Sequence, residues 1–431
     1  MRIAIHTLGC KVNQYETQAM ERILTERGHI LVECEHMADA VIINTCAVTA
    51  SGDRKSRQAV RQARRSSPDA IIAVCGCYAQ IAPKEVGELD VDLICGTGER
   101  VHFLDLLERV CQTRDRMTAV TDVKAHRNFE LLPAGGLEGR TRAMLKVEDG
   151  CTNFCAYCVI PYARGAVRSL APIDVALELY RLSEQGYMEI VLTGIEISSW
   201  GRDLPGGQSL TDLVEMVCKW DYNGRIRLGS LEPRTITEDF CQRLSVYSNL
   251  CPHFHLSLQS GCDATLARMN RKYDTARYLE SVILLRRWFP KAAITTDLIV
   301  GFPGETEEEF EETLAFIRRC NFASMHIFPY SKRPGTPAAT FSNQLSNHEK
   351  SERAKRASIV AKEMTKTWLN GFLGQKEEVL FEEERDGYWR GHTKQFVPVS
   401  VHGENLHNRF AEVEVTAVTQ NECYGTIVQG E

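Results

Sequence analysis

The chain has 431 residues, 43% of them hydrophobic and 25% charged, which excludes a disordered or fibrous protein and allows two or three folded domains. No stretch approaches the roughly 20 apolar residues of a membrane span. The first apolar run, residues 3–8, is too short for a signal peptide, so we predict a soluble, cytoplasmic protein. A formal net charge of -6 excludes nucleic-acid binding by bulk attraction, so any RNA contact must use local basic patches.

Residues 1–115 alternate short apolar runs with amphipathic stretches, which predicts a parallel sheet with helices on its faces. The predicted strands are residues 3–8, 30–34, 41–44, 71–74 and 93–94, and the predicted helices are residues 13–27 and 52–65. A polar stretch containing Pro133, Gly135 and Gly136 follows. It predicts a linker, which we place at residues 116–141.

The alternation resumes in residues 142–370. Predicted strands are residues 143–147, 190–193, 226–229, 253–257, 293–300 and 324–329, and predicted helices are residues 173–185, 210–219, 278–288, 307–318 and 347–369. About six βα units predict a partial (β/α)6 barrel with its chemistry at the carboxyl ends of the strands.

Five short strands are predicted in the last region, residues 371–431, and they indicate a small all-β barrel. They are residues 378–381, 388–391, 396–401, 409–418 and 424–428. Tyr388, Trp389 and Phe396 either stack on bases or fill the barrel core, and we expect the core for Phe396. The predicted fold class is therefore α/β with a terminal all-β domain.

Sixteen cysteines in an intracellular chain favour metal or redox chemistry over disulfides. Cys151, Cys155 and Cys158 form a C-x3-C-x2-C run after the first strand of the barrel region. Three thiolates so close can bind three irons of a four-iron cluster and leave the fourth iron open. A structural zinc site needs four ligands, and this loop contains no fourth Cys or His.

The spacing of these cysteines resembles that of the radical S-adenosylmethionine superfamily. The resemblance implies a [4Fe-4S] cluster whose open iron is chelated by S-adenosylmethionine, and reductive cleavage of that cofactor to a 5′-deoxyadenosyl radical. It also implies cofactor contacts at strand ends, namely Thr193, Gly194, Glu196, Ser230, Glu232, Val300, Gly301 and Pro329. Residues 194–196 depart from the usual Gly-Gly-Glu, and a solvated loop carboxylate is the alternative role for Glu196.

Three more cysteines, Cys10, Cys46 and Cys77, follow strands of the first region. Loops at the carboxyl ends of parallel strands converge on one edge of a sheet, so distant cysteines can meet there. The residues alone do not choose among Cys75, Cys77 and Cys95. Cys75 continues an apolar run, so we expect it in the hydrophobic core.

The segments Thr7-Leu8-Gly9-Cys10, Asn44-Thr45-Cys46 and Gly76-Cys77-Tyr78 resemble the methylthiotransferase family, over a likeness that extends to a carboxyl-terminal TRAM domain. The resemblance implies that Cys10, Cys46 and Cys77 hold an auxiliary [4Fe-4S] cluster whose open iron carries the sulfur to be transferred. It also implies two cofactor molecules per turnover, one that methylates the sulfide and one that is cleaved to the radical. The other ten cysteines are expected to be packing residues.

Residues 9–17, 160–165 and 328–333 most resemble the branch that acts on N6-threonylcarbamoyladenosine beside the tRNA anticodon. This implies insertion of a methylthio group at C2 of that adenosine, with a low-potential electron donor, such as a flavodoxin or ferredoxin, and a sulfur source as partners. The substrate carboxylate selects a cation. The candidates are Arg164, Arg168, Lys332 and Arg333, with a surface or phosphate-facing charge as the alternative for each.

The predicted helix at residues 52–65 carries six basic residues and one acid, Asp53. A solvated face and a tRNA phosphate-binding face are equal alternatives, and Arg57, Arg61 and Arg64 are the candidate contacts. Residues 374–431 instead have 5 Lys/Arg against 11 Asp/Glu. That acidity suits a basic protein substrate, so a ribosomal-protein methylthiotransferase remains an alternative, as do action on isopentenyladenosine tRNA and a non-enzymatic iron–sulfur RNA-binding protein.

Overall fold

The computed structural model describes residues 1–33, 37–136 and 140–428. Its first part contains a parallel sheet of six strands among these residues, in the order β2-β1-β3-β4-β5-β6. The strands are β1 (Arg2–Thr7), β2 (Ile30–Leu31), β3 (Ala40–Thr45), β4 (Ile71–Gly76), β5 (Leu93–Cys95) and β6 (Met117–Ala119). The helices are α1 (Lys11–Glu26), α2 (Ala50–Ser66), α3 (Cys77–Ile81), α4 (Pro83–Gly87) and α5 (Arg100–Thr113).

Both faces of this sheet are buried, which explains its continuous apolar strands. Val41 and Ile43 pack with Val60 of α2 on one face, whereas Ile42 packs with Leu104 of α5 on the other. The sequence does not predict α5 or β6. Strand β6 lies inside the predicted linker and has only three residues, too few for a periodic signal. The predicted strand at residues 30–34 ends at Leu31, and Cys34 lies outside the described residues.

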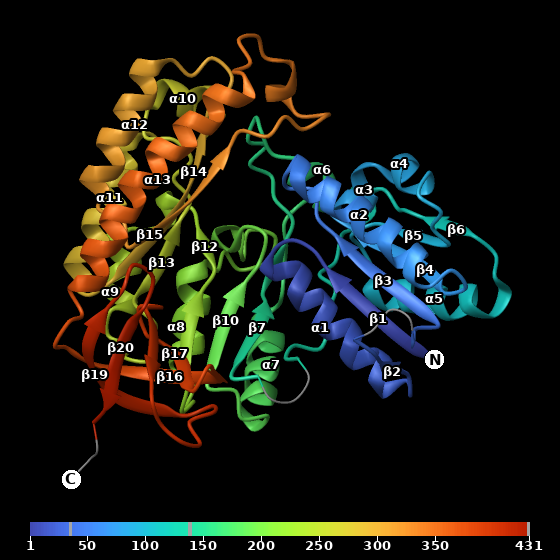
Figure 1. Cartoon of the computed structure of the whole chain (residues 1–431), viewed down its shortest axis with the longest axis horizontal. Coiled ribbons are helices and arrows are strands. Elements are labelled where there is room, and N and C mark those ends of the chain that lie inside the picture. Colours follow the sequence, from blue (N-terminus) through green and yellow to red (C-terminus); the bar gives the residue numbers. More distant parts are fainter. Residues whose placement is uncertain (34–36, 137–139, 429–431) are drawn as a thin grey trace.

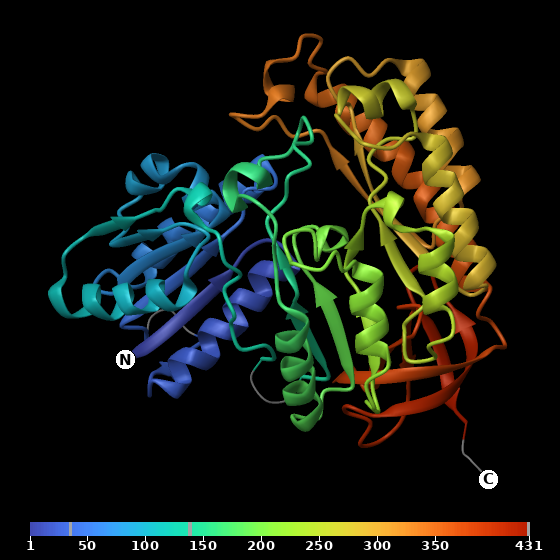
Figure 2. The ribbon, with the colours of Figure 1, turned by 180° about the vertical axis from the view of Figure 1, so that it is seen from behind.

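The middle of the chain forms an open-sided barrel, which confirms the predicted partial (β/α)6 fold (Figures 1 and 2). Its strands are β7 (Arg142–Lys146), β10 (Glu189–Thr193), β11 (Arg225–Leu228), β12 (Ser230–Leu231), β13 (His253–Leu256), β14 (Ala293–Val300) and β15 (Ser324–Pro329). They pair in parallel as β7-β10-β11 and β12-β13-β14-β15, and only Gly229 separates β11 from β12.

Helices cover the outer face of the barrel, and the largest hydrophobic core of the described chain lies beneath them (Figure 1). They are α7 (Pro172–Glu184), α8 (Leu210–Cys218), α9 (Glu238–Leu244), α10 (Asp263–Arg268), α11 (Thr275–Trp288), α12 (Glu307–Cys320) and α13 (Asn347–Asn370). A short helix, α6 (Ile160–Arg164), and a two-residue pairing of β8 (Glu148–Asp149) with β9 (Arg168–Ser169) lie at the carboxyl end of β7. None of the helices among the described residues has the length and apolar composition needed to cross a membrane.

The last region forms a closed barrel in the order β16-β17-β18-β20-β19, which confirms the predicted small all-β domain. The strands are β16 (Lys376–Arg385), β17 (Tyr388–Thr393), β18 (Pro398–Val401), β19 (Phe410–Val418) and β20 (Cys423–Ile427). This barrel lies against the amino ends of the central strands (Figure 1), where Arg225 Nη2 donates to His392 O at 3.0 Å and Arg227 Nη1 to Lys394 O at 2.9 Å.

The prediction that Phe396 fills the terminal barrel is wrong. Strand β18 begins at Pro398, and Phe396 lies in the preceding turn with a φ of 65°. Its ring stacks on His392 at 4.4 Å, and the guanidinium groups of Arg142 and Arg227 each lie 4.8 Å from its centroid. Phe396 therefore joins the terminal barrel to the central one.

Candidate iron–sulfur and cofactor site

The loop from Cys151 to Cys158 lies between β8 and α6, at the carboxyl end of β7. Gly150 has a φ of 90°, and a Cβ there would meet Ala166 O at 2.0 Å, so only glycine allows this turn. The Cys151 N–H donates to Gly165 O at 3.0 Å, and the Cys158 N–H donates to Cys155 O at 2.9 Å. Backbone bonds thus fix the loop, and none of its three thiols is in a disulfide.

The side chain of Arg271 contacts this loop at a cysteine sulfur. Its Nη1 donates to Cys155 Sγ at 3.2 Å, and Nη2 donates to Ser257 O at 3.4 Å. Burial raises the pKa of Cys151 and of Cys158 to about 12, so a bare thiolate here needs a positive partner. No sequence pattern predicts this role of Arg271, because the residue follows α10, more than a hundred residues beyond the cysteines, and belongs to no motif.

Two carboxylates at the strand ends face the same region. Glu148 Oε2 accepts the backbone N–H of Glu196 at 2.7 Å, and Asn153 Nδ2 donates to Glu196 Oε2 at 3.2 Å. The Oε1 atoms of Glu148 and Glu196 are buried and have no hydrogen-bond partner in the described part of the chain. Burial raises the pKa of Glu148 well above its usual value, and that of Glu196 as well. These orphaned acceptors fit a ligand that carries ammonium or hydroxyl donors.

The other predicted cofactor residues are brought to this end of the barrel. Thr193 ends β10, and a Cβ on Gly194 would meet Glu148 Oε2 at 2.7 Å. Ser230 is exposed on β12, and Glu232 accepts from Arg234 Nε at 2.9 Å. Val300 pairs with Pro329 in register, and the N–H of Gly301 donates to Glu305 Oε2 at 2.6 Å, so the turn after β14 is held internally.

The second set of cysteines meets at the carboxyl edge of the first sheet. Cys10 precedes α1, Cys46 follows β3 and Cys77 begins α3. A Cβ on Gly9 would lie 3.0 Å from Cys46 Sγ, which shows how closely these loops approach. Burial raises the pKa of Cys46 to about 12, and the charges of Cys77 and Cys10 act in the same direction.

Asn13 ties these loops together, because its Nδ2 donates to Leu8 O at 2.7 Å and to Thr45 O at 3.0 Å. Cys75 lies in the hydrophobic core with Cys95, as predicted for Cys75. In the described ranges, no three His, Cys, Asp or Glu side chains are placed to chelate a single metal ion. The thiolates of a four-iron cluster each bind a different iron, so a cluster site differs from such a single-ion site.

The two cysteine sets lie at one interface between the first domain and the barrel. Helix α3, which begins at Cys77, packs on α6, which follows Cys158, and the charge of Cys77 acts on the Cys158 thiol. Thr97 Oγ1 also donates to Ala163 O of α6 at 2.6 Å. Loops far apart in sequence thus present both sets to one region.

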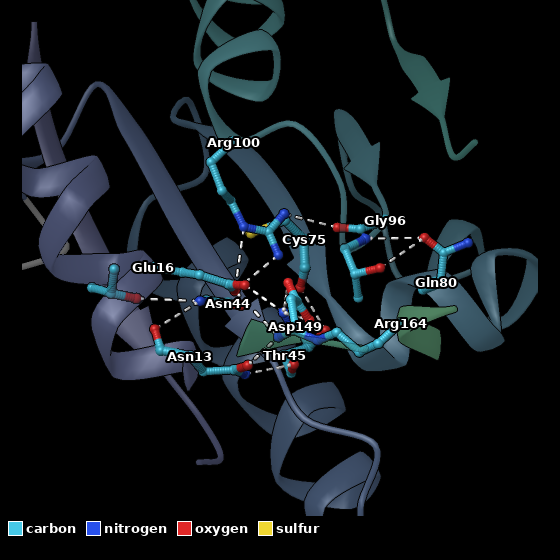
Figure 3. A network of polar contacts seen from close by, with 12 residues as sticks. Asn13, Glu16, Asn44, Thr45, Cys75, Gln80, Gly96, Arg100, Asp149 and Arg164 are labelled. Carbon is cyan, nitrogen blue, oxygen red and sulfur yellow. Dashed lines mark hydrogen bonds and ion pairs between the residues drawn. The ribbon is translucent and has the colours of Figure 1, made fainter. Parts of the chain in front are cut away.

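A buried ionic network fills the space beside them (Figure 3). Arg164 is fully buried, pairs with Glu16 and with Asp149 at 3.3 Å, and donates from Nη2 to Asn13 Oδ1 at 3.0 Å. Lys146 lies 3.2 Å from Asp149, and Arg100 lies 3.0 Å from Glu16. The network joins α1 of the first domain to β8 and α6 of the barrel.

These contacts correct the assignment of three cations to the substrate carboxylate. The terminal nitrogens of Arg164 are engaged in the network. Those of Arg168 contact Arg164 O, Ala166 O and Asp149, and those of Arg333 contact Asp53. Only Lys332 among the four candidates is exposed and without a partner in the described residues.

The basic face of α2 is partly committed to internal contacts. Arg57 Nη1 donates to Tyr78 OH at 3.0 Å, and Arg64 donates to Pro68 O, Ala70 O and Asp90 O and pairs with Asp92. Arg61 is exposed, as are Arg54 and Arg65. They line a groove of about 770 Å³ beside Glu88, Leu89 and Asp90.

Known proteins share both parts of this architecture. Residues 2–96 match the family described as "Uncharacterized protein family UPF0004", and residues 145–317 match the radical SAM superfamily. The solved structure of the radical S-adenosylmethionine methyltransferase TsrM from Kitasatospora setae, with cobalamin and a [4Fe-4S] cluster bound, covers 78% of this chain and 76% of its own. Its TM-score is 0.56 at 15% identity, which shows a common fold. The fold, together with the match of residues 145–317 to the superfamily, defines a radical SAM enzyme, whose cofactors are S-adenosylmethionine and an iron–sulfur cluster.

Curated relatives narrow this class. Threonylcarbamoyladenosine tRNA methylthiotransferase MtaB of Bacillus subtilis (strain 168) is 38% identical over 420 residues, 96% of this chain and 93% of that protein. The tRNA-2-methylthio-N(6)-dimethylallyladenosine synthase of Acetivibrio thermocellus is 33% identical and covers 99% of this chain and 90% of its own. The chain belongs to the methylthiotransferase family of radical SAM enzymes.

Proposed function

We propose that the protein inserts a methylthio group at C2 of N6-threonylcarbamoyladenosine in tRNA. The observation that carries the proposal is the meeting of two cysteine sets at one interface, where α3 packs on α6. Sulfur storage and radical formation require separate centres that act on one substrate atom, and two cysteine sets at one interface support such an arrangement. The name of the Bacillus subtilis relative supports the substrate.

Two [4Fe-4S] clusters fit these residues, one at Cys151, Cys155 and Cys158 and the auxiliary one at Cys10, Cys46 and Cys77. When bound, the clusters and S-adenosylmethionine supply a carbon-centred radical and the sulfur and methyl groups. The chain's own task is to hold them and to exclude water. Arg271 maintains positive charge at Cys155 Sγ, which favours the thiolate form that binds iron.

The cofactor's polar groups find partners at the strand ends. Glu148 and Glu196 offer buried acceptors for its amino group, and the other residues proposed to line its site are Thr193, Gly194, Ser230, Glu232, Val300, Gly301 and Pro329. A low-potential electron donor, such as a flavodoxin or ferredoxin, and a sulfur source complete the set of partners.

We infer that Lys332 receives the threonylcarbamoyl carboxylate. It follows Pro329 at the carboxyl end of β15, in a loop fixed to the first domain because Ala50 N–H donates to Ser331 Oγ at 2.9 Å and Arg333 pairs with Asp53. Both contacts are with the start of α2. A tRNA bound along the exposed arginines of α2 would therefore present its anticodon loop near Lys332 and the barrel opening.

The name of the Acetivibrio thermocellus relative contains dimethylallyladenosine, which is isopentenyladenosine. This name supports isopentenyladenosine tRNA as a second candidate substrate. The test gives reconstituted protein three tRNAs, bearing threonylcarbamoyladenosine, isopentenyladenosine or plain adenosine, with S-adenosylmethionine and a reductant. We expect 2-methylthio product by mass spectrometry from the first alone, since only that base carries the carboxylate with which Lys332 would pair. Equal product from all three, or product only from a ribosomal protein, would contradict the proposal.

The same assay tests Lys332. We expect Lys332→Met to lower kcat/KM for threonylcarbamoyladenosine tRNA by about 10- to 100-fold, the effect of losing one charged hydrogen bond. Formation of 5′-deoxyadenosine without tRNA should be unchanged. Lys362→Met, at an exposed lysine of α13, is the matched control and should behave as wild type. A Lys332→Met enzyme with full activity would remove Lys332 from substrate binding.

A further inference from the structure

The inner face of the barrel carries a group of side chains that the functions above do not use. On β13 and β14, Phe254, Leu256, Ile294 and Leu298 face the helices and belong to the main core. Successive side chains of a strand point to opposite faces, so the residues between them face the barrel interior. These inward residues are His255, Thr295 and Asp297, followed on β15 by His326 and Phe328.

Their contacts form a continuous surface. His255 Nδ1 lies 3.0 Å from Thr295 Oγ1, and His255 Nε2 lies 3.3 Å from Asp297 Oδ2, so both imidazole nitrogens are engaged. Asp297 pairs in register with His326. The ring of His326 lies 6.4 Å from that of His255 and 6.4 Å from that of Phe328. These contacts fix the orientation of the His255 imidazole, and the pair of His255 and Asp297 lies beside His326.

Two side chains of this surface are exposed. The imidazole of His326 makes no hydrogen bond with another described residue, and 43% of the Phe328 surface is accessible. A Phe inside an enzyme barrel gains nothing from facing solvent, because burial of its ring would stabilise the fold by about 1.5–3 kcal/mol. Adjacent exposed rings are the surface on which flat aromatic ligands stack.

The surface lies just below the cysteine loop. Ile299, two residues beyond Asp297 on the same face, packs against the small core that includes Ala156 of that loop. Two residues of a strand span about 7 Å. Similarly, Ser257 follows His255 by two residues, and its carbonyl accepts from Arg271, which contacts Cys155. A ligand stacked here would have one edge directed at the radical centre.

We propose that His326 and Phe328 form the platform on which the target adenine base of the tRNA stacks. The inference rests on the proposed function and deepens it by assigning the site of the base. A nucleotide must leave the RNA stack to be modified inside a barrel, and an extruded base is read by aromatic stacking. Phe328 also lies four residues before Lys332, so one strand and its loop contact both the base and its carboxylate.

The experiment replaces the platform while it preserves the cofactor site. We expect Phe328→Ala and His326→Ala each to lower kcat/KM for threonylcarbamoyladenosine tRNA by about 10- to 100-fold, as loss of one base stack does. Phe328→Trp and His326→Phe should restore most activity, and Phe328→Leu should not, because rescue requires a flat ring. Ile359→Ala, at an exposed position of α13, is the control. Iron content and melting temperature verify that each variant is folded.

Adenine also occurs in S-adenosylmethionine, so cofactor cleavage without tRNA decides which adenine is stacked. Unchanged 5′-deoxyadenosine formation in Phe328→Ala supports the tRNA base, whereas a comparable loss would assign the platform to the cofactor and overturn the inference. Full activity of both alanine variants would also overturn it.

A wild type that modified no tRNA would refute the proposed function instead. The inference would then be decided by the fluorescence of Phe328→Trp. An anticodon stem-loop should quench the fluorescence of Phe328→Trp more than that of wild type, and S-adenosylmethionine alone should not. No quenching by the stem-loop would refute the platform.

Discussion

Cys75 and Cys77 are two residues apart, and both are buried, but they belong to different hydrophobic clusters. Cys75 ends the apolar run of β4 and packs with Ile42 and Leu93. Gly76 has a φ of 96°, and a Cβ there would meet Thr45 O at 2.5 Å, so glycine is required for the turn that carries Cys77 to Cys10 and Cys46. One glycine thus separates a packing thiol from a proposed iron ligand.

This contrast gives a residue-scale prediction. Fully loaded wild type should contain about eight irons, and Cys77→Ala should contain about four and form no methylthio product while still cleaving S-adenosylmethionine. Cys75→Ala should keep both its iron and its activity, because Cys75 is fully buried in the hydrophobic core beneath the sheet. Iron analysis and product mass spectrometry measure the result. Iron loss in Cys75→Ala but not in Cys77→Ala would reverse the ligand assignment.

The sequence predicts the role of a residue when that role depends on its neighbours along the chain. It does not predict a role that depends on a partner far away in the sequence. The cysteine spacing marks the first loop, and an apolar run marks Cys75 as core. The role of Arg271 depends on a sulfur atom 116 residues away, and that of Arg164 on Glu16, 148 residues away. An arginine's sequence context does not indicate whether a carboxylate or solvent will face it, and for this reason three predicted substrate cations are internal.

Helix α2 illustrates the same division at the scale of an element. Thr49 caps it, since Thr49 Oγ1 accepts the Gly52 N–H at 3.0 Å, and its buried residues Ser56, Val60 and Ala63 recur at helical spacing. That pattern predicts the helix from sequence. Strand β6 shows the limit, because three residues form a strand only through pairing with β5.

The two kinds of arginine on α2 should behave differently. Replacing Arg54, Arg61 and Arg65 by Ala should weaken tRNA binding and reduce the slope of log affinity against log salt by about 0.7–0.9 for each lost phosphate contact. Arg64→Ala should leave that slope unchanged and lower the melting temperature, because Arg64 bonds three carbonyls and Asp92. Binding titrations at several KCl concentrations measure the slope. An unchanged slope in the triple variant would exclude this face from tRNA binding.

At the scale of the whole molecule, buried ionic networks join the three parts. Glu16 and Arg164 connect the first domain to the central barrel, and Glu189 forms ion pairs with Arg142, Arg225 and Arg227 beside the terminal barrel. The pKa of Glu189 lies well below its usual value because these cations outweigh its burial. Sequence patterns predicted the three domains but not the ionic networks between them, because each network pairs charges that are far apart along the chain.

The last prediction concerns the ionic network of Glu16 between the first domain and the central barrel. Burial opposes the charge of Glu16, but Arg100, Arg164 and Lys146 outweigh it and lower the pKa of Glu16 to about 2. The pKa of Glu16 in the unfolded chain is about 4.3, so the carboxylate stabilises the fold fully above that pH and loses its contribution as pH falls toward 2.

Glu16→Gln should therefore lower the free energy of unfolding by about 3–5 kcal/mol at pH 7, the cost of an unpaired buried charge. Glu26→Gln, which removes an exposed pair with Arg22, should cost at most about 1 kcal/mol. Urea unfolding of the iron-free proteins at pH 7 and pH 3 measures both, and the Glu16 deficit should shrink at pH 3. Equal costs for the two variants at pH 7 would show that the network does not hold the domains together.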